Sequence, residues 1–270
     1  MDTDGVATIR AKDRAIRSFA LPSWFSPPLI RAASFVFFFL AWEIASILVA
    51  HRSLPSPLAV AESLYTYTVH GDLLESIAIT LARVGVSFVI AMFIGTAMGM
   101  LMGRYKGFDY VFDSWLVLGL NIPAIIVAFL CFLWVGLDDQ ALVLAVIINK
   151  VPTVTVMVRE GARAVDRDYL QVAQAYRLSP YKTLFKIHLP QLYPYIMAAA
   201  RSGLALIWKI ILVFELIGLS SGVGYKLQYY FQIFDMSSVL AYTFAFVAIV
   251  MLIELLVLRP AERKLTGWRL

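Results

Sequence analysis

The sequence predicts an all-α protein whose chain crosses a membrane several times. Of its 270 residues, 61% are apolar and only 15% are charged, and the mean hydropathy is +0.79. A water-soluble chain of this size is nearer half apolar and a quarter charged. Six segments are also long and apolar enough to cross a bilayer core, which takes about 20 helical residues. Lipid is therefore expected to be part of the solvent of this protein.

The six predicted spans are residues 29–50, 77–102, 112–136, 140–158, 191–216 and 238–258. The last span is uninterrupted, whereas Pro123 interrupts the third. Proline frees a backbone carbonyl, which is tolerated in a span only where protein, water or a side chain replaces the lost bond. The neighbouring Asn121 is a candidate for that replacement, or alternatively lines a path through a broken third span.

The Lys and Arg residues outside the spans predict the orientation of the chain. Seventeen of the 23 lie in the N-terminal segment, at Arg31 at the start of the first span, in the second and fourth loops and in the C-terminal tail, against only Arg52 and Lys226 in the other loops. The positive-inside rule then places both termini and the loop at residues 159–190 in the cytoplasm. Residues 1–28 form a cytoplasmic tail or an interfacial helix, residues 29–258 the six-span domain, and residues 259–270 a cytoplasmic tail.

Several other classes of protein do not fit this pattern. The net charge of +5 is divided among short segments between apolar runs, whereas a nucleic-acid binder gathers its cations on one face. The single Cys131 lies in an apolar run and is expected to be a small buried hydrophobe. The three histidines fall at or outside span ends, so no pair of intramembrane haem ligands is expected: His51, His70 and His188.

The fourth loop, residues 159–190, is the only cytoplasmic loop long enough to hold structure of its own. The apolar side chains of its first half fall mainly on one side of a helix: Tyr169, Leu170, Val172, Ala173 and Tyr176. Ser179 and Pro180 then predict an N-cap and a first helical position. We expect this second helix to stop near Leu189 and Pro190. Two short helices with an apolar stripe that needs a partner are therefore predicted at the cytoplasmic face.

A spaced motif runs through this loop. It consists of Gln171-Val172-Ala173, three residues, Arg177, nine residues, and Ile187-His188-Leu189-Pro190. It resembles the Glu-Ala-Ala, Gly, Ile-x-Leu-Pro loop of permease subunits of binding-protein-dependent ABC importers, with every spacing kept. Two identities depart, since Gln171 replaces the glutamate and Arg177 replaces a turn glycine. A left-handed Arg177 would cost about 1 kcal/mol, unless the turn at Ser179 avoids that conformation.

Five further motifs extend the resemblance over residues 54–268, closest to the nitrate, sulfonate and taurine branch of these permeases. They start at Leu54, Thr80, Gly95, Leu133 and Glu215. The resemblance implies the type I importer fold in a bacterial inner membrane, as a homodimer with two ATP-binding subunits and a periplasmic or lipid-tethered solute-binding protein. The loop residues expected to contact those subunits are Gln171, Val172, Ala173, Tyr176, Arg177, Ser179, Pro180, Phe185, Ile187, Leu189 and Pro190.

The chain itself is not expected to hydrolyse ATP or to hold a cofactor. It has no G-x-x-x-x-G-K-S/T phosphate loop, so ATP and Mg are expected in the partner subunits. The Gly-rich stretch at residues 218–226 has the wrong spacing and is interpreted as a tight turn before the last span or, alternatively, as a substrate contact. A stand-alone secondary transporter is the rival interpretation. It would need midplane carboxylates for a coupling ion, and apart from Asp113 at the edge of the third span, the spans hold only Glu43, Glu215 and Glu254.

Polar side chains at membrane depth are candidates for the translocation path, because ionisable groups there are costly and are usually functional. The candidates are Asn121, Asn149, Lys150, Trp208, Lys209 and Glu215. One hypothesis is that the lysines line the path and favour a small polar or anionic solute. The alternative is that Lys150 or Lys209 only pairs with Glu215. The small residues Gly85, Gly95, Gly99 and Gly103 are expected to permit close helix packing, within the chain or between two copies.

Overall fold

The computed structural model describes residues 27–49 and 53–260. The predicted interfacial segment at residues 11–25 and the basic residues of the C-terminal tail beyond residue 260 lie outside the described residues. The chain forms two units, residues 1–58 and 59–270, which are described separately. In the first unit, helix α2 (Pro27–Val49) is the first predicted span. Trp42 Nε1 donates to the carbonyl of Pro55 at 3.0 Å, so the chain beyond this helix returns to it.

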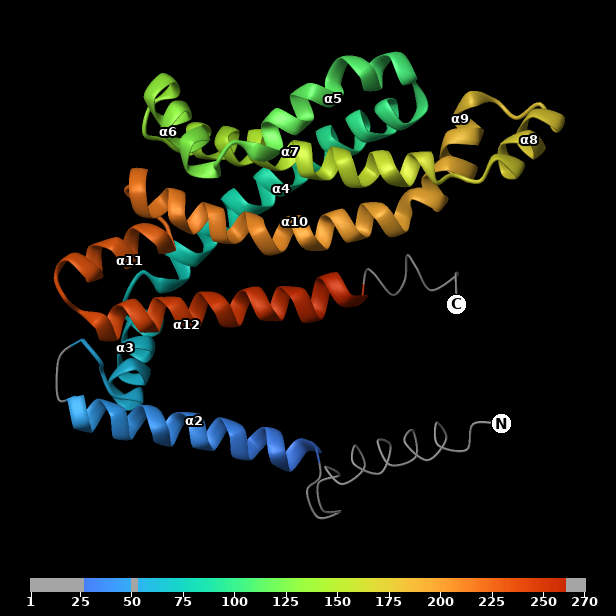
Figure 1. Cartoon of the computed structure of the whole chain (residues 1–270). Coiled ribbons are helices and arrows are strands. Elements are labelled where there is room, and N and C mark those ends of the chain that lie inside the picture. The colour runs from blue at the N-terminus through green and yellow to red at the C-terminus, as the bar shows by residue number, and fades with distance from the viewer. Residues whose placement is uncertain (1–26, 50–52, 261–270) are drawn as a thin grey trace, which may run out of the picture. The chain divides into compact units, whose positions relative to one another are not determined.

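Helices alone make up the regular structure of the second unit in the part that the structure describes (Figure 1). The first helix, α3 (Pro57–Val69), begins at the end of the first unit. The elements that follow are, in chain order, α4 (Leu73–Arg104), α5 (Lys106–Asn121), α6 (Ala124–Val135), α7 (Asp139–Arg163), α8 (Arg167–Ala175), α9 (Pro180–Thr183), the π-turn η1 (Leu184–His188), α10 (Leu189–Gly218), α11 (Val223–Gln232), α12 (Met236–Ile253) and the π-turn η2 (Glu254–Leu258).

Small residues set the spacing between α4 and α7. A methyl group on Gly95 would lie 2.6 Å from Val154 Cβ, and one on Gly99 would lie 2.7 Å from the carbonyl oxygen of Thr155. Gly103 faces Ala162 in the same way, so the two helices run parallel with their backbones close together. The packing expected of these three glycines is therefore confirmed within the chain. Gly85 differs, because no atom lies within 4 Å of the Cβ position there.

Helix α10 packs antiparallel to α7, as Figure 1 shows. Gly161 near the end of α7 meets the ring of Tyr195 near the start of α10. The core between these helices and α6 is aliphatic and aromatic, with Val146, Ile211 and Phe214 each at most 1% exposed. Cys131 is buried in the same cluster, so its interpretation as a small buried hydrophobe is confirmed.

The six-span prediction holds only when two helices are counted as one span. Among the residues that the structure describes, five helices are long and apolar enough to cross a membrane, and the pair α5 and α6 qualifies together but is bent by 97°. The bend lies at Ile122 and Pro123, so the third span is broken rather than continuous. The Asn121 side chain donates to the carbonyl of Val117 at 2.7 Å. The carbonyl that Pro123 leaves without a donor is that of Gly119, four residues before it, so the expected compensating role of Asn121 is wrong.

Candidate functional site

The predicted first helix of the long loop is confirmed as α8. Asp166 caps it, accepting the backbone N–H of Asp168 at 2.9 Å. After Tyr176 the chain turns at Arg177, whose φ is +49°. The N–H of Leu178 donates to the carbonyl of Ala173 at 2.9 Å, and the N–H of Arg177 donates to Gln174 at 3.0 Å. This pair of bonds is a Schellman motif, in which glycine is the usual left-handed residue. The turn at Ser179 therefore does not spare Arg177 the left-handed conformation.

The predicted start of the second helix is also confirmed, but its predicted end is wrong. Ser179 accepts the N–H of Lys182, and Pro180 occupies the first helical position of α9. The helix does not stop near Pro190, since α9, η1 and α10 follow one another without a break. In the π-turn the N–H of Leu189 donates to the carbonyl of Leu184, five residues earlier. This shift in hydrogen bonding lets the helix continue past a proline that has no N–H to donate.

The loop presents apolar side chains away from the bundle. Five of them, named here the coupling patch, are 47% to 77% exposed: Tyr169, Val172, Tyr176, Tyr181 and Phe185. The rings of Tyr181 and Phe185 lie 4.5 Å apart, so α9 and η1 present them together. Ala173 is only 3% exposed, and Leu170 packs on the core beside Val158. The predicted stripe is thus divided between an inward side and an exposed side.

The other loop residues of the motif are placed in two ways. Gln171, Arg177, Ser179 and Pro180 are exposed, whereas Ile187, Leu189 and Pro190 are half-buried.

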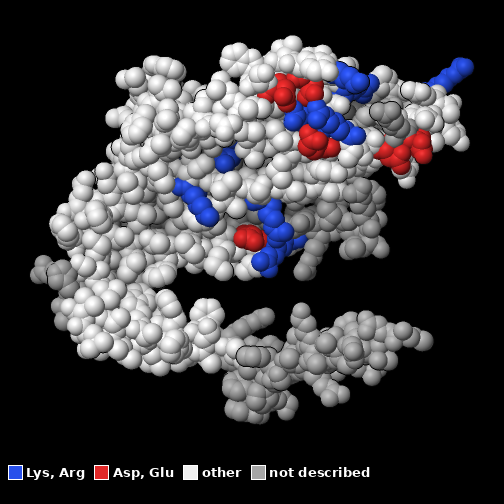
Figure 2. Space-filling view, in the orientation of Figure 1, with Lys and Arg blue, Asp and Glu red and all other residues white. Residues whose placement is uncertain are grey.

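Beside the loop, ion pairs join the end of α7 to the start of α5. Arg159 lies 2.5 Å from Asp113, and Arg163 lies 2.5 Å from Asp109. Figure 2 shows these elements as a group of acidic and basic side chains. The loop is therefore attached to a charged end of the bundle.

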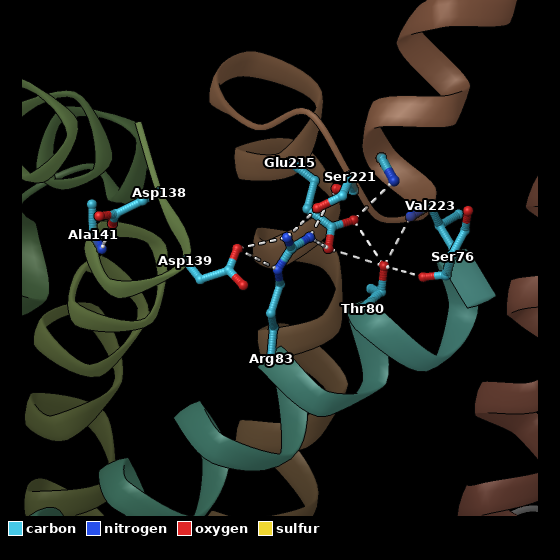
Figure 3. Close-up of polar contacts among 10 residues, drawn as sticks. Ser76, Thr80, Arg83, Asp138, Asp139, Ala141, Glu215, Ser221 and Val223 are labelled. Atoms are coloured by element: carbon cyan, nitrogen blue, oxygen red, sulfur yellow. Dashed lines mark hydrogen bonds and ion pairs between the residues drawn. The ribbon is translucent and has the colours of Figure 1, made fainter. Parts of the chain in front are cut away.

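A buried polar cluster lies at the opposite end of the bundle, where α4 and α7 begin (Figure 3). Its centre is Glu215 on α10, which is fully buried. Arg83 Nη1 donates to Glu215 at 2.5 Å, Thr80 Oγ1 lies 2.9 Å from both carboxylate oxygens, and the N–H of Gly224 donates at 2.9 Å. Glu215 thus has hydrogen-bond donors from α4 and from the first turn of α11.

Arg83 joins this cluster to two further elements. Its guanidinium lies 2.6 Å from Asp139 at the start of α7 and donates to the carbonyl of Ser221 at 2.8 Å. The hydroxyl of Ser221 accepts another of its N–H groups at 2.7 Å. Gly222 follows with a φ of +96°. The Gly-rich stretch is therefore a tight turn, as one of the two sequence interpretations held, and the turn is bound to α4 through Arg83.

Glu215 has neither of the partners expected from the sequence. Lys209 precedes it by six residues on α10, which places the lysine on another side of that helix. Lys150 lies eleven residues beyond Asp139 on α7, about 16 Å farther along the helix axis. Arg83 is the partner because it lies on α4 beside the start of α7, where Asp139 lies, and beside the end of α10, where Glu215 lies. In the described part of the chain, Lys150 is 5% exposed and has no ion pair.

A second polar contact lies near the same end of the bundle. Asp72, just before α4, forms an ion pair with Lys226 of α11 and accepts the hydroxyl of Tyr242 on α12. Burial alone would raise the pKa of Asp72, but the bonds from Lys226 and Tyr242 outweigh it and hold the pKa below its ordinary value. The three helices are therefore joined through one ionised carboxylate.

The six predicted path residues are not brought together. Trp208 and Lys209 line a cavity between α4, α10 and α12. The lining does not include the other four: Asn121, Asn149, Lys150 and Glu215. Within the described residues, no group of three His, Cys, Asp or Glu side chains is placed to hold a metal ion.

These features define a polytopic helical membrane protein with an exposed apolar patch on a loop at one end and a buried charged cluster at the other. Residues 91–259 match the model of the family described as "binding-protein-dependent transport system inner membrane component". The chain belongs to this family. It is a permease subunit of an ABC importer and not a stand-alone secondary transporter.

Relatives and solved structures agree with this family. The aliphatic sulfonates transport permease protein SsuC of Bacillus subtilis (strain 168) is 28% identical over 84% of this chain and 83% of its own length. TauC, the taurine transport system permease protein of Escherichia coli (strain K12), is 26% identical over 84% of each chain. A chain of the MetNI methionine ABC transporter in inward-facing conformations has a TM-score of 0.63 at 20% identity, covering 72% of this chain and 95% of that one. The predicted type I importer fold is confirmed.

Proposed function

We propose that the chain moves a small polar or anionic solute of the nitrate, sulfonate or taurine kind from a binding protein into the cytoplasm. The support comes from the names of the relatives, which are permeases for aliphatic sulfonates and for taurine. A cationic surplus within the bundle supports the same class of solute, because Arg201 and Lys209 of α10 lie on one cavity with Glu254 as its only carboxylate. Nitrate, a smaller inorganic anion, shares with the sulfonates only the negative charge.

The motor in this proposal is a pair of separate ATP-binding subunits, which bind ATP and Mg. One observation carries it, namely the exposure of the coupling patch. Aromatic side chains such as Tyr176, 77% exposed, and Tyr181, 70% exposed, stand on short helices bound to the bundle. An exposed aromatic group of this kind is typical of a protein interface. The patch would fill a groove of the ATP-binding subunit.

The proposal includes an orientation and an assembly. Two copies of the chain span the bacterial inner membrane, each with a permease domain at residues 29–258. Both termini and residues 159–190 face the cytoplasm, where the coupling patch reaches the ATP-binding subunits. The polar cluster at Glu215 then faces the outer side, where the periplasmic or lipid-tethered binding protein releases solute. The distribution of Lys and Arg supports this orientation.

The test is co-purification of the chain with its candidate ATP-binding subunits, followed by the rate of ATP hydrolysis. A charge in the coupling patch, Tyr176→Asp, is expected to abolish co-elution. Gln174→Asp is the matched control, because it puts the same charge on the same helix about half a turn away from Tyr176. Ala173 is unsuitable for this purpose, since it is 3% exposed and a carboxylate there would disturb α8 itself. Co-elution that survives Tyr176→Asp, or is lost equally in Gln174→Asp, would refute the role of the patch.

A further inference from the structure

One cavity of the second unit lies between α4, α10 and α12. It measures 780 Å³ and is bounded by α4, α10 and the end of α12. Figure 2 shows a hollow between α10 and α12 with a few charged side chains along it. Cavities that hold small molecules usually measure about 300–1,000 Å³. The volume therefore suits a small organic molecule.

The cavity has an apolar wall and a cationic wall. Leu81 and Val84 of α4 face Val247 and Val250 of α12 across it. Helix α10 supplies most of the polar groups, among them Arg201 and Lys209, and Glu254 follows α12. The Nζ of Lys209 lies 5.4 Å from the centre of the Trp208 ring, and the described residues give it no ion pair. A cation–π contact fixes the ammonium group while leaving N–H donors for a ligand.

The remaining charges of the cavity lie farther along α10. Arg201 is eight residues before Lys209, about 12 Å along the helix axis. Its Nη2 lies 4.0 Å from Glu254, and Arg259 lies 3.6 Å from the same carboxylate. Glu254 is thus engaged at the Arg201 end, and the Lys209 end keeps its positive charge. In a low dielectric this charge attracts an anion and disfavours a cation.

We propose that this cavity binds an aliphatic sulfonate, with the sulfonate at Lys209 and Trp208 and the alkyl chain between α4 and α12. The inference rests on the proposed function, because it gives the transported anion a site within the permease itself. The two walls select two properties at once. The ammonium group of Lys209 favours a ligand with a permanent negative charge, and the apolar wall favours a ligand with an alkyl chain. A compact anion such as nitrate meets only the first requirement.

The chain offers a variant that fills the cavity without disturbing its walls. Gly85 lines the cavity, and nothing lies within 4 Å of the Cβ position there. Gly85→Leu therefore places a side chain in the open volume. Gly107→Leu is the matched control, because its Cβ position is equally open and Gly107 does not line the cavity. Lys209→Gln removes the charge and keeps most of the side-chain length.

The experiment measures calorimetric binding of ethane-, butane- and hexanesulfonate to the permease with its ATP-binding subunits in phosphatidylcholine nanodiscs. Affinity is expected to rise about fourfold per methylene group until the cavity is full. Butyltrimethylammonium is not expected to bind. Lys209→Gln should weaken butanesulfonate binding about tenfold, Gly85→Leu should abolish it, and Gly107→Leu should leave it unchanged.

Three results would overturn the proposal. The first is that no alkanesulfonate binds. The second is binding that Lys209→Gln and Gly85→Leu both leave unchanged. The third is competition by anionic phosphatidylglycerol, which would show that the cavity is a lipid site. The proposed function fails separately. A complex that assembles and hydrolyses ATP but binds no sulfonate refutes only the site, whereas a chain that never joins the ATP-binding subunits refutes the function.

Discussion

The substitution Arg177→Gly tests whether the loop carries backbone strain. Arg177 has a φ of +49° and closes the Schellman motif at the end of α8. A residue with a Cβ pays about 1–2 kcal/mol for the left-handed conformation. Glycine avoids that cost but loses more conformational freedom on folding, about 0.5–1 kcal/mol. The expected net stabilisation of the turn is therefore about 0.5–1 kcal/mol.

Backbone amide exchange is the suitable measurement, because the turn opens locally without unfolding the bundle. The N–H groups of Arg177 and Leu178 form the two bonds of the motif. A gain of 1 kcal/mol corresponds to about fivefold slower exchange of these amides, after correction for the intrinsic rate of glycine. Arg177→Val, with a branched Cβ, should exchange faster than the wild type.

Arg177→Ala is the control for this prediction. It removes the exposed guanidinium but keeps the Cβ, so the strain argument predicts no slowing of exchange. If Arg177→Ala slows exchange as much as Arg177→Gly, the effect belongs to the lost charge and the reasoning from backbone strain is wrong. Equal exchange in the glycine variant and the wild type would refute it as well.

Three other substitutions test the end of the bundle near Glu215. Glu215→Leu removes the buried one of the two carboxylates paired with Arg83 and leaves only the exposed Asp139, so it should cost up to about 3–5 kcal/mol of unfolding free energy in a denaturant titration. Adding Arg83→Leu should recover part of this loss, and two additive losses would contradict the pairing. Gly222→Ala adds strain at a φ of +96° and a methyl group against the Glu215 carboxylate, so the melting temperature should fall, whereas Gly107→Ala should not lower it. Because the pKa of Asp72 is lowered in the folded protein, the ionised carboxylate stabilises the fold above the ordinary value of 3.8, and this stabilisation is lost as the pH falls through the lower folded value. In Asp72→Asn the melting temperature should therefore depend less on pH over that acidic range. A pH profile unchanged from the wild type would refute the contribution of Asp72.

Local chemistry explains which parts of the fold were predictable. The start of α9 depends on Ser179 and Pro180, whose capping roles involve only neighbouring residues. Long apolar runs likewise predict the positions of α4, α7 and α12. Helices α3 and α11 were not predicted, because they have 13 and 10 residues and are too short to cross a bilayer. The bend at Pro123 was located, but its angle depends on how α5 and α6 pack on α7.

The polar cluster could not be assembled from the sequence, since its members come from four distant segments. Arg83 lies within the second predicted span, residues 77–102. The signal lay in its type and depth, because an arginine in a span requires a carboxylate near it. Few acidic residues lie in the predicted spans, and the sequence left open whether Glu215 pairs with Lys150 or with Lys209. Which helices stand level with one another is a property of packing, as the contact of Arg83 with Asp139 shows.

The continuity of one helix determines how the two ends of the bundle can affect each other. From Pro180 to Gly218 the chain is helical over 39 residues, and it carries Phe185 of the coupling patch, Lys209 of the cavity and Glu215 of the polar cluster. A rigid displacement of this helix would move all three together. The exceptions are the π-turn at Leu184–His188 and Pro194 within α10, because helices bend where the hydrogen bonding is irregular or a proline interrupts it. A force that travels from the coupling patch along this helix crosses both points before it reaches Lys209. How far they yield sets how much of the displacement reaches the cavity.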